Sequence, residues 1–206
     1  MRAPAGVCII AVVSLTQSTM LPLGTAAPDF SLQDAVSGST VSLDSVAEGR
    51  DGLLVMFICA HCPFVVHVQD ELARLGRDYG SRKLGIVAIS SNSVVSHPED
   101  APGRLKAMAR RLGFQFPYLY DESQEVAKAY TAACTPDFFL FGADNRLAYR
   151  GRLDASRPGN GVPVDGRDLR AAIDAVLAGG SVAGAQLPSA GCNIKWAPGN
   201  SPAYFG

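Results

Sequence analysis

The chain contains the stretch Leu53-Leu54-Val55-Met56-Phe57-Ile58-Cys59-Ala60-His61-Cys62-Pro63-Phe64, in which an apolar run leads directly into two closely spaced cysteines. The first six residues are continuously apolar over the length of a strand, which is typical of a strand buried on both faces. From Phe64 to Leu75 apolar residues recur at helical spacing with polar residues between them, and Gly80 then ends the pattern. The stretch predicts a buried strand, a loop that carries the cysteines, and an amphipathic helix.

Strand and helix patterns alternate along the rest of the chain. A hairpin is expected between Phe30 and Leu43, around the turn residues Ser37-Gly38. Alternation of this kind predicts an α/β fold in which helices flank a central mixed sheet. Further strands are expected at residues 84–89, 116–119, 137–141 and 147–152, and further helices at residues 103–112, 122–131 and 168–177.

The length of 206 residues suits one well-buried domain with modest additions. Residues 1–19 are expected to form a poorly ordered N-terminal extension, and residues 20–178 the domain itself. Residues 179–206 are rich in Gly, Pro and Ser, so they are expected to form an irregular tail packed on the domain.

The composition narrows the class of partner. Apolar residues make up 48% and charged residues 18% of the chain, which is ordinary for a globular protein. The net charge of −1 gives no electrostatic reason to expect binding to nucleic acid or to an anionic membrane. We therefore expect neither a nucleic-acid partner nor a membrane partner.

An apolar run from Gly6 to Leu15 follows Arg2 and superficially resembles a signal peptide. It carries one positive charge, and the small-residue cleavage candidate at Thr25-Ala26-Ala27 is followed by Pro28. It is also far shorter than the roughly 20 residues that span a bilayer. We expect a cytoplasmic protein, and the alternative is export to the periplasm with residues 1–27 acting as a signal.

The placement of Cys59 and Cys62 matters more than their spacing, because the first cysteine ends a predicted strand and the second begins a predicted helix. Free N–H groups and the positive end of the helix dipole stabilise a thiolate there, and such thiols have pKa values of roughly 3.5–7.5. A protonated His61 between the cysteines would favour the thiolate further. Pro63 suits the first turn, where its missing N–H costs nothing.

A pair of cysteines at this spacing is also found as half of a structural zinc site. Such sites need a second pair of ligands at similar spacing, whereas Cys134 and Cys192 are isolated in the sequence. A Cys-Cys-His copper site is a further alternative, although His67, one turn and a residue beyond Cys62, is expected to lie at the surface rather than to be a ligand. We expect no metal and no other cofactor.

A second motif, Cys134-Thr135-Pro136, stands just before the strand predicted at residues 137–141. Together with the cysteine pair at a strand-to-helix junction, it resembles the thioredoxin superfamily. The resemblance implies a thioredoxin-like fold in which Pro136 is cis and lies against Cys59 and Cys62, with Cys134 nearby. An ordinary proline at the start of a strand is the alternative interpretation.

The resemblance extends from about Met20 to the C-terminus and narrows to one branch. Residues Ala27-Pro28-Asp29-Phe30-Ser31-Leu32 resemble the opening of AhpC/TSA (peroxiredoxin) and TlpA-like proteins. Residues 57–64, 133–141 and 191–196 resemble a poorly characterised peroxiredoxin-like group of redoxin-domain proteins.

The chain departs from the better-known relatives at defined positions. The Pro and the Ser or Thr that precede a peroxiredoxin's reactive cysteine are Val55 and Cys59 here. The aromatic residue before the thioredoxin motif is Ile58, and the strand predicted at residues 53–58 lacks the buried acid that serves thioredoxin as proton relay. The chain is therefore neither a standard peroxiredoxin nor a standard thioredoxin.

The first functional hypothesis is thiol–disulfide exchange in antioxidant defence and redox homeostasis. Cys59, expected to be the more exposed cysteine, attacks as a thiolate, and Cys62 then resolves the mixed disulfide. His61 tunes the redox potential and Thr135-Pro136 aligns the substrate. The partners would be a protein or small-molecule thiol or disulfide and an external thiol reductant.

Two alternatives stay open. In a thiol peroxidase, Cys62 would reduce a hydroperoxide and would be resolved by Cys59, Cys134 or Cys192. In a non-catalytic module, the same thiols would hold zinc or copper. Cys134 and Cys192 could resolve or relay a disulfide, or could be inert buried residues, as Cys8 is expected to be.

Overall fold

The apolar run at residues 53–58 forms the central strand β4 (Gly52–Phe57), all of which is buried. The structure is a computed structural model that describes residues 15–205. β4 pairs in parallel with β5 (Leu84–Ser90) and antiparallel with β8 (Asp137–Gly142). The sheet is therefore mixed, as expected, and its middle strands have no solvent-exposed face.

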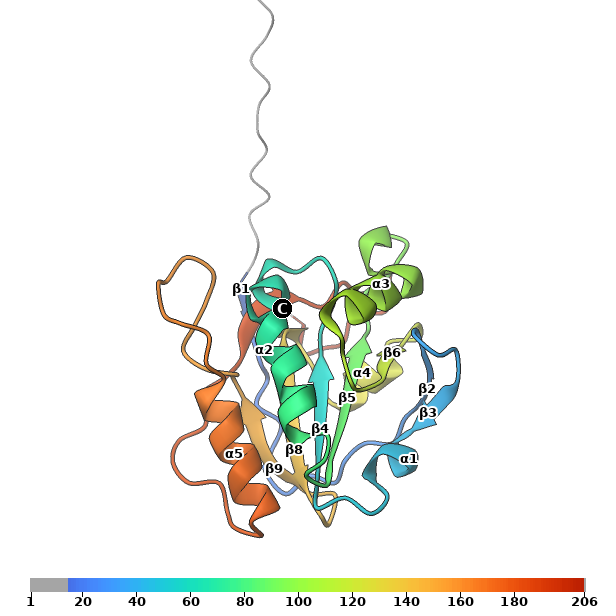
Figure 1. The fold of residues 1–206 in the computed structure, drawn as a ribbon. Coiled ribbons are helices and arrows are strands. Elements are labelled where there is room, and N and C mark those ends of the chain that lie inside the picture. The colour runs from blue at the N-terminus through green and yellow to red at the C-terminus, as the bar shows by residue number, and fades with distance from the viewer. Residues whose placement is uncertain (1–14, 206) are drawn as a thin grey trace, which may run out of the picture.

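The main sheet has seven strands in the described part of the chain, and its order is β3-β2-β6-β5-β4-β8-β9 (Figure 1). β5 and β6 are parallel, and the remaining neighbours outside the β4–β5 pair are antiparallel. The four strands not yet bounded are β2 (Ser31–Asp34), β3 (Thr40–Ser42), β6 (Tyr118–Tyr120) and β9 (Leu147–Gly151).

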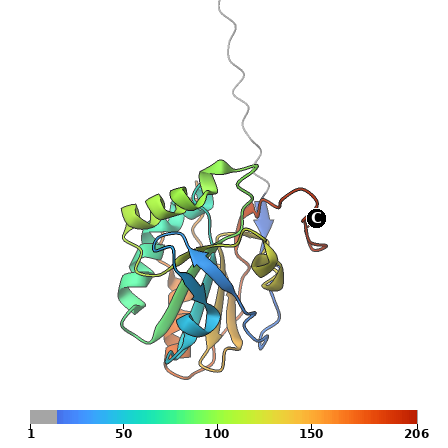
Figure 2. The same cartoon turned by 90° about the vertical axis from the view of Figure 1, so that its right-hand side faces the viewer.

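Helices cover both faces of this sheet and create two hydrophobic clusters. One face packs against α2 (Pro63–Tyr79), α3 (Pro102–Leu112) and α5 (Arg167–Leu177). The other packs against α1 (Leu43–Ala47) and α4 (Glu125–Ala129). Figure 2 shows α2 and α3 on one side of the sheet and α4 on the other. This is the layered arrangement of a thioredoxin-like fold.

In the main sheet and the helices that cover it, the predicted elements correspond closely to the observed ones, with two differences. The helix expected at residues 122–131 shortens to α4, whose N-cap Gln124 has a left-handed backbone conformation. Helix α1 was not expected, because five residues are too few to show helical periodicity; it begins with a capping box between Ser42 and Ser45.

A second, three-stranded sheet corrects the expectation of an irregular tail. Its order is β1-β10-β7, and its strands are β1 (Leu15–Gln17), β10 (Ala190–Asn193) and β7 (Cys134–Thr135). Part of residues 1–19 is therefore ordered, since β1 pairs with the tail; residues 1–14, including Cys8, lie outside the described range. The first strand of the described chain thus meets its last strand beside the Cys134-Thr135-Pro136 motif.

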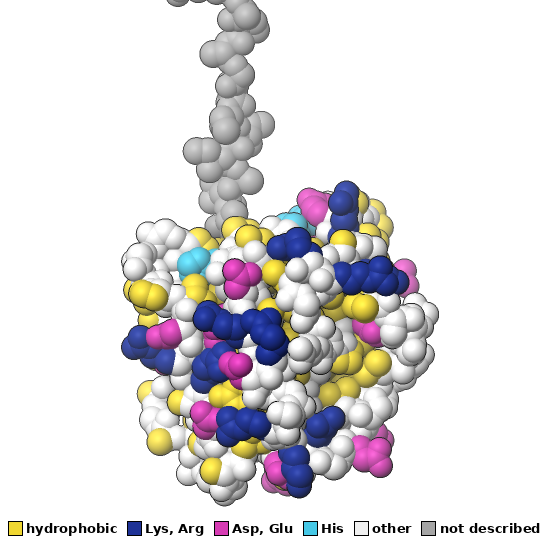
Figure 3. Space-filling view, in the orientation of Figure 1, with side chains coloured by type: hydrophobic (Ala, Val, Ile, Leu, Met, Phe, Trp, Pro, Cys, Tyr) yellow, Lys and Arg dark blue, Asp and Glu magenta, His cyan; other side chains and the backbone are white. Residues whose placement is uncertain are grey.

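The surface over α2 and α5 mixes both signs of charge (Figure 3). Glu71, although buried, forms ion pairs with Arg74 and Arg170. On this face basic side chains lie among acidic ones rather than forming an unbroken basic surface. Within residues 15–205, no helix combines the length and the apolar character that crossing a membrane requires.

Candidate active site

Cys59 and Cys62 lie where β4 passes into α2, as the sequence predicts. The backbone of Ile58 still pairs with Ile89 at the end of the sheet (3.0 Å), so Cys59 follows the last residue held by the strand. Cys62 is the N-cap of α2 and Pro63 occupies its first turn. Both cysteines are enclosed, with exposed fractions of 1% and 0%, so exposure does not single out Cys59 as the attacking residue.

Thr135 contacts both sulfur atoms. Its Oγ1 lies 3.4 Å from the Sγ of Cys59, and its carbonyl oxygen accepts a hydrogen bond from the Cys62 thiol at 3.2 Å. The Thr135–Pro136 peptide bond is cis, which confirms the interpretation of Pro136 drawn from the family resemblance. The two motifs of the sequence therefore form one site.

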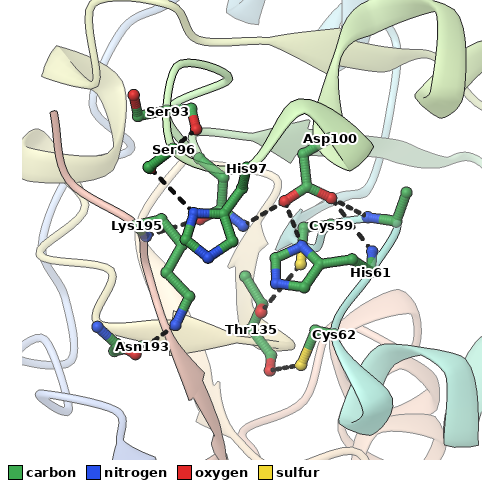
Figure 4. Close-up of polar contacts among 12 residues, drawn as sticks. Cys59, His61, Cys62, Ser93, Ser96, His97, Asp100, Thr135, Asn193 and Lys195 are labelled. Atoms are coloured by element: carbon green, nitrogen blue, oxygen red, sulfur yellow. Dashed lines mark hydrogen bonds and ion pairs between the residues drawn. The ribbon is translucent and has the colours of Figure 1, made fainter. Parts of the chain in front are cut away.

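Asp100 belongs to this site and was missed by sequence reasoning. It ends a short 3₁₀ helix, η1 (Pro98–Asp100), and is fully buried. Its carboxylate accepts hydrogen bonds from the backbone N–H groups of Ala60 (2.8 Å) and His61 (3.1 Å), and its Oδ2 lies 2.6 Å from Nδ1 of His61 (Figure 4). A single Asp in a polar loop gives no sequence pattern that would mark this role.

The Asp100 carboxylate controls the charge of His61. Its hydrogen bond raises the pKa of the imidazole above the usual value. Burial opposes ionisation of Asp100, but hydrogen bonds from His61 and Asn92 outweigh it and lower the pKa of the carboxyl group. The pair therefore favours a protonated imidazole between the two cysteines.

A second layer of polar residues surrounds this pair. The His97 ring stacks on that of His61, with centroids 5.0 Å apart, and burial together with the charge of His61 lowers the pKa of His97. Asn92 donates to Asp100 at 2.7 Å and accepts from the backbone N–H of Lys195 at 2.8 Å. Asn92 thus ties the loop that carries Asp100 to the C-terminal tail.

The surroundings of the two thiols favour ionisation at Cys62. Hydrogen bonds from the thiols of Cys192 and Cys59 lower the pKa of Cys62, and Thr135 and the backbone N–H of Val65 act in the same direction. The hydrogen bond to Cys62, burial and the charge of Asp100 raise the pKa of Cys59. These surroundings therefore favour the thiolate at the cysteine that begins the helix rather than at Cys59.

The remaining described cysteines have different settings. Cys192, on β10, shares a hydrogen bond with Cys62, which together with burial raises the pKa of the Cys192 thiol. Cys134 is fully buried, its thiol approaches the carbonyl oxygen of Pro136 at 3.7 Å, and burial raises its pKa. The structure therefore brings Cys192, rather than Cys134, into hydrogen-bonding contact with the motif.

A buried acid, Asp137, lies beside the Cys134-Thr135-Pro136 motif on β8 rather than on β4. Asp137, the first residue of β8, is opposite Phe57 in the sheet, and burial raises the pKa of its carboxyl group to about 7. Residues 53–58 contain no acid, but the neighbouring strand supplies one. Its sequence signal is a charged residue that opens the apolar run Phe138 to Phe141.

The ligand atoms that could surround a metal ion are those of Cys59, His61 and Asp100, all within 4.8 Å of one another. This group holds one cysteine, whereas the Cys-Cys-His copper alternative needs two. Three donors are fewer than the four of a structural zinc site, and one His61 nitrogen already bonds to Asp100. The geometry fits a hydrogen-bonded ion pair better than a metal cage.

The sequence of residues 23–150 matches the model of the AhpC/TSA family. A protein from Geobacillus kaustophilus, described as an uncharacterized conserved protein, is 53% identical, with a TM-score of 0.87 over 89% of this chain and 97% of that one. A hypothetical protein from Sinorhizobium meliloti 1021 is 50% identical, with a TM-score of 0.87 over 89% of this chain and 100% of that one.

A thiol:disulfide interchange protein from Chlorobium tepidum shares the fold, with a TM-score of 0.58 and 18% identity over 75% of this chain and 97% of that one. Among curated proteins, none matches the chain. The family match covers more than half of the sequence and agrees with the sheet order, the cis proline and the cysteine pair. The chain is a thioredoxin-fold redoxin protein and belongs to the AhpC/TSA family.

Proposed function

We propose that this protein is a thiol–disulfide oxidoreductase whose redox centre is the pair Cys59 and Cys62. The observation that supports it best is the setting of Cys62 at the N-terminus of α2, where hydrogen bonds from neighbouring thiols and from the backbone favour its thiolate. A thiolate beside a second thiol is the arrangement that disulfide exchange requires.

The proposed roles reverse the assignment expected from the sequence. The Cys62 thiolate attacks one sulfur of a substrate disulfide, and the other substrate sulfur leaves as a thiolate. Cys59 then loses its proton and attacks the Sγ of Cys62, which releases the second substrate thiol and leaves the Cys59–Cys62 disulfide. The Thr135 hydroxyl, which lowers the pKa of both cysteines, lies where it can donate a hydrogen bond to each thiolate in turn.

The test separates the two cysteines. In the double variant Cys59→Ser/Cys192→Ser the mixed disulfide between Cys62 and the substrate should accumulate, because neither neighbouring thiol is left to resolve it, whereas Cys62→Ser should form none. Mass spectrometry of the acid-quenched protein measures both. A mixed disulfide that accumulates in Cys62→Ser and not in the double variant would restore Cys59 as the nucleophile.

A thiol peroxidase is the second candidate, and the enclosure of both sulfurs favours it, since a hydroperoxide is smaller than a protein disulfide. The Cys62 thiolate would attack the peroxide oxygen and become a sulfenic acid, with release of water or an alcohol. Cys59 would then displace water to form the disulfide. Peroxide consumption that depends on Cys62, together with failure to reduce a protein disulfide, would favour this reaction over exchange.

Metal binding is tested separately, by elemental analysis of protein purified without added metal. Stoichiometric zinc or copper that is lost in Cys59→Ser would favour the non-catalytic module and count against both redox reactions.

A further inference from the structure

Strand β10 carries Cys192 to the middle of the small sheet. Cys192 pairs with Leu15 of β1 on one side and with Thr135 of β7 on the other. The approach to β7 is so close that a Cβ on Gly191 would collide with the carbonyl oxygen of Thr135. Glycine at that position is what lets the tail lie directly against the active-site segment.

This placement puts a third sulfur beside the redox pair. Thr135, the partner of Cys192 in the sheet, is the residue that touches both Cys59 and Cys62. Helix α2 packs against β10, and the three cysteines belong to one buried cluster. Both of the other thiols are among the groups that lower the pKa of Cys62. Cys62 therefore has two possible disulfide partners nearby.

A positive charge just after β10 favours a reactive thiol at Cys192. The charge of Lys195, three residues after Cys192, favours ionisation of the Cys192 thiol and opposes the effects of Cys62 and burial. The Lys195 ammonium group is held by the side chain of Asn193 at 2.7 Å. Cys134 has no such cation among the groups that influence it, and faces Asp137 instead.

We propose that Cys192 is a third redox cysteine, which takes over the disulfide from Cys59 by exchange at Cys62. The inference rests on the proposed function. After an external disulfide or hydroperoxide has oxidised the pair, the Cys192 thiolate attacks the Sγ of Cys62. The Cys62–Cys192 bond forms, the Cys59–Cys62 bond breaks, and Cys59 leaves as a thiolate that takes up the proton lost by Cys192. No net oxidation occurs in this step.

The consequence is a disulfide that moves from the β4–α2 junction to the C-terminal tail. All three sulfurs are at most 4% exposed, so the exchange takes place inside the protein and needs no access from solvent. Cys59 returns to the thiol state while the tail stays covalently attached to the start of α2. An external thiol reductant would then act on a disulfide carried by β10.

The sequence offers a direct way to detect this bond. Cleavage after Lys and Arg leaves Cys59 and Cys62 together in the peptide 51–74, Cys192 in the peptide 171–195, and Cys134 in the peptide 129–146. The full chain is reduced, treated with one equivalent of hydrogen peroxide or of a small-molecule disulfide, quenched in acid at successive times, alkylated and digested. Mass spectrometry then separates the internal disulfide of 51–74 from a link between 51–74 and 171–195.

In the wild type, the internal disulfide should form first and the link to 171–195 should follow. Cys59→Ser should give the linked peptides as its main oxidised product. Cys192→Ser should lose them completely while retaining the internal disulfide, and the control Cys134→Ser should give both products.

Two results overturn the inference, and they are distinguishable. If Cys59→Ser is oxidised at Cys62 and the wild type forms its internal disulfide, yet neither yields the linked peptides, the relay is wrong and the redox pair stands. If peptide 51–74 of the wild type is not oxidised at all, the proposed function fails and the relay fails with it. The wild-type time course keeps the test valid if a variant folds poorly.

Discussion

The buried carboxylate of Asp100 lies 2.6 Å from Nδ1 of His61 and also accepts hydrogen bonds from the backbone N–H groups of Ala60 and His61. One side chain thus fixes both the backbone of the loop between the cysteines and the ring that stands in it. Asp100 is separated from the motif by α2 and β5 in the chain, so the geometry of the redox loop depends on a distant segment.

Replacing Asp100 by Asn should destabilise the protein by roughly 1–3 kcal/mol, the usual effect of leaving buried hydrogen-bonding groups unpaired. It should also change the pH dependence. The pKa of His61 in the folded protein is raised above 6.5, so the stabilisation it provides is complete below pH 6.5 and is lost as the pH rises through the folded value.

Urea unfolding between pH 6 and 9 measures this effect. The lowered pKa of Cys62 makes its own contribution rise with pH in both proteins, so the comparison between them isolates His61. The free energy of unfolding of the wild type relative to that of Asp100→Asn should therefore fall across the range. Asp70→Asn removes an exposed carboxylate that is not among the groups acting on His61, and is the control. An equal pH dependence in the wild type and in Asp100→Asn would contradict the role given to the pair.

Replacing Cys192 by Ala should raise the pKa of Cys62, because the hydrogen bond from Cys192 is the largest of the effects that lower it. A hydrogen bond to a charged group contributes about 1.5–3 kcal/mol, which corresponds to an upward change of about one to two pKa units. The pH dependence of alkylation reports the pKa of Cys62. It is measured in proteins that also carry Cys59→Ala, so that Cys62 is the one thiol on peptide 51–74. The control Cys134→Ala should leave the midpoint of this pH dependence unchanged. Equal midpoints with and without Cys192 would contradict the contact between Cys192 and Cys62.

Replacing Thr135 by Val keeps the branched shape and removes the hydroxyl that lies 3.4 Å from Cys59 and favours both thiolates. The pH midpoint for alkylation of Cys62 should rise by about one unit, the equivalent of roughly 1.4 kcal/mol. Thr135→Ser retains the hydroxyl and should keep nearly the midpoint of the wild type. If Ser and Val have the same effect, the hydroxyl is not what matters.

Asp137 should make the protein less stable as the pH rises from about 4 to 7. The folded protein holds its proton up to about pH 7, whereas the unfolded chain releases it near 3.8, so the folded state binds more protons in this window. The two values differ by about three units, which corresponds to a fall on the order of 4 kcal/mol. Urea unfolding of Asp137→Asn should lack this fall, and the exposed Asp70→Asn should retain it.

The main elements could be predicted because burial leaves a periodic trace in the sequence. The run Leu53 to Ile58 and the helical spacing after Phe64 placed β4 and α2 nearly to the residue. Strand β10 could not be found in this way. It is short, contains Gly191, and pairs with β7 through backbone contacts that its side chains do not encode.

The candidate site was predicted to the extent that it consists of chemically distinctive residues. Cys59, His61, Cys62, Thr135 and Pro136 come together as expected. Asp100 and the contact of Cys192 with Cys62 depend on how a loop and a tail fold over the sheet, which no local pattern records. The relative acidity of the two thiols, likewise, is a property of their packed surroundings rather than of their spacing.

Because β10 lies between β1 and the Thr135 segment, the first and last strands of the described chain border the thiol site. Changes to either of these strands therefore alter the surroundings of the reactive cysteines. Removing residues 15–17 would strip one edge from the strand that carries Cys192, and ending the chain before residue 190 would open Cys62 to water. Affinity tags and shortened versions of this protein should accordingly be compared with the intact chain before any measured reactivity is attributed to the cysteines alone.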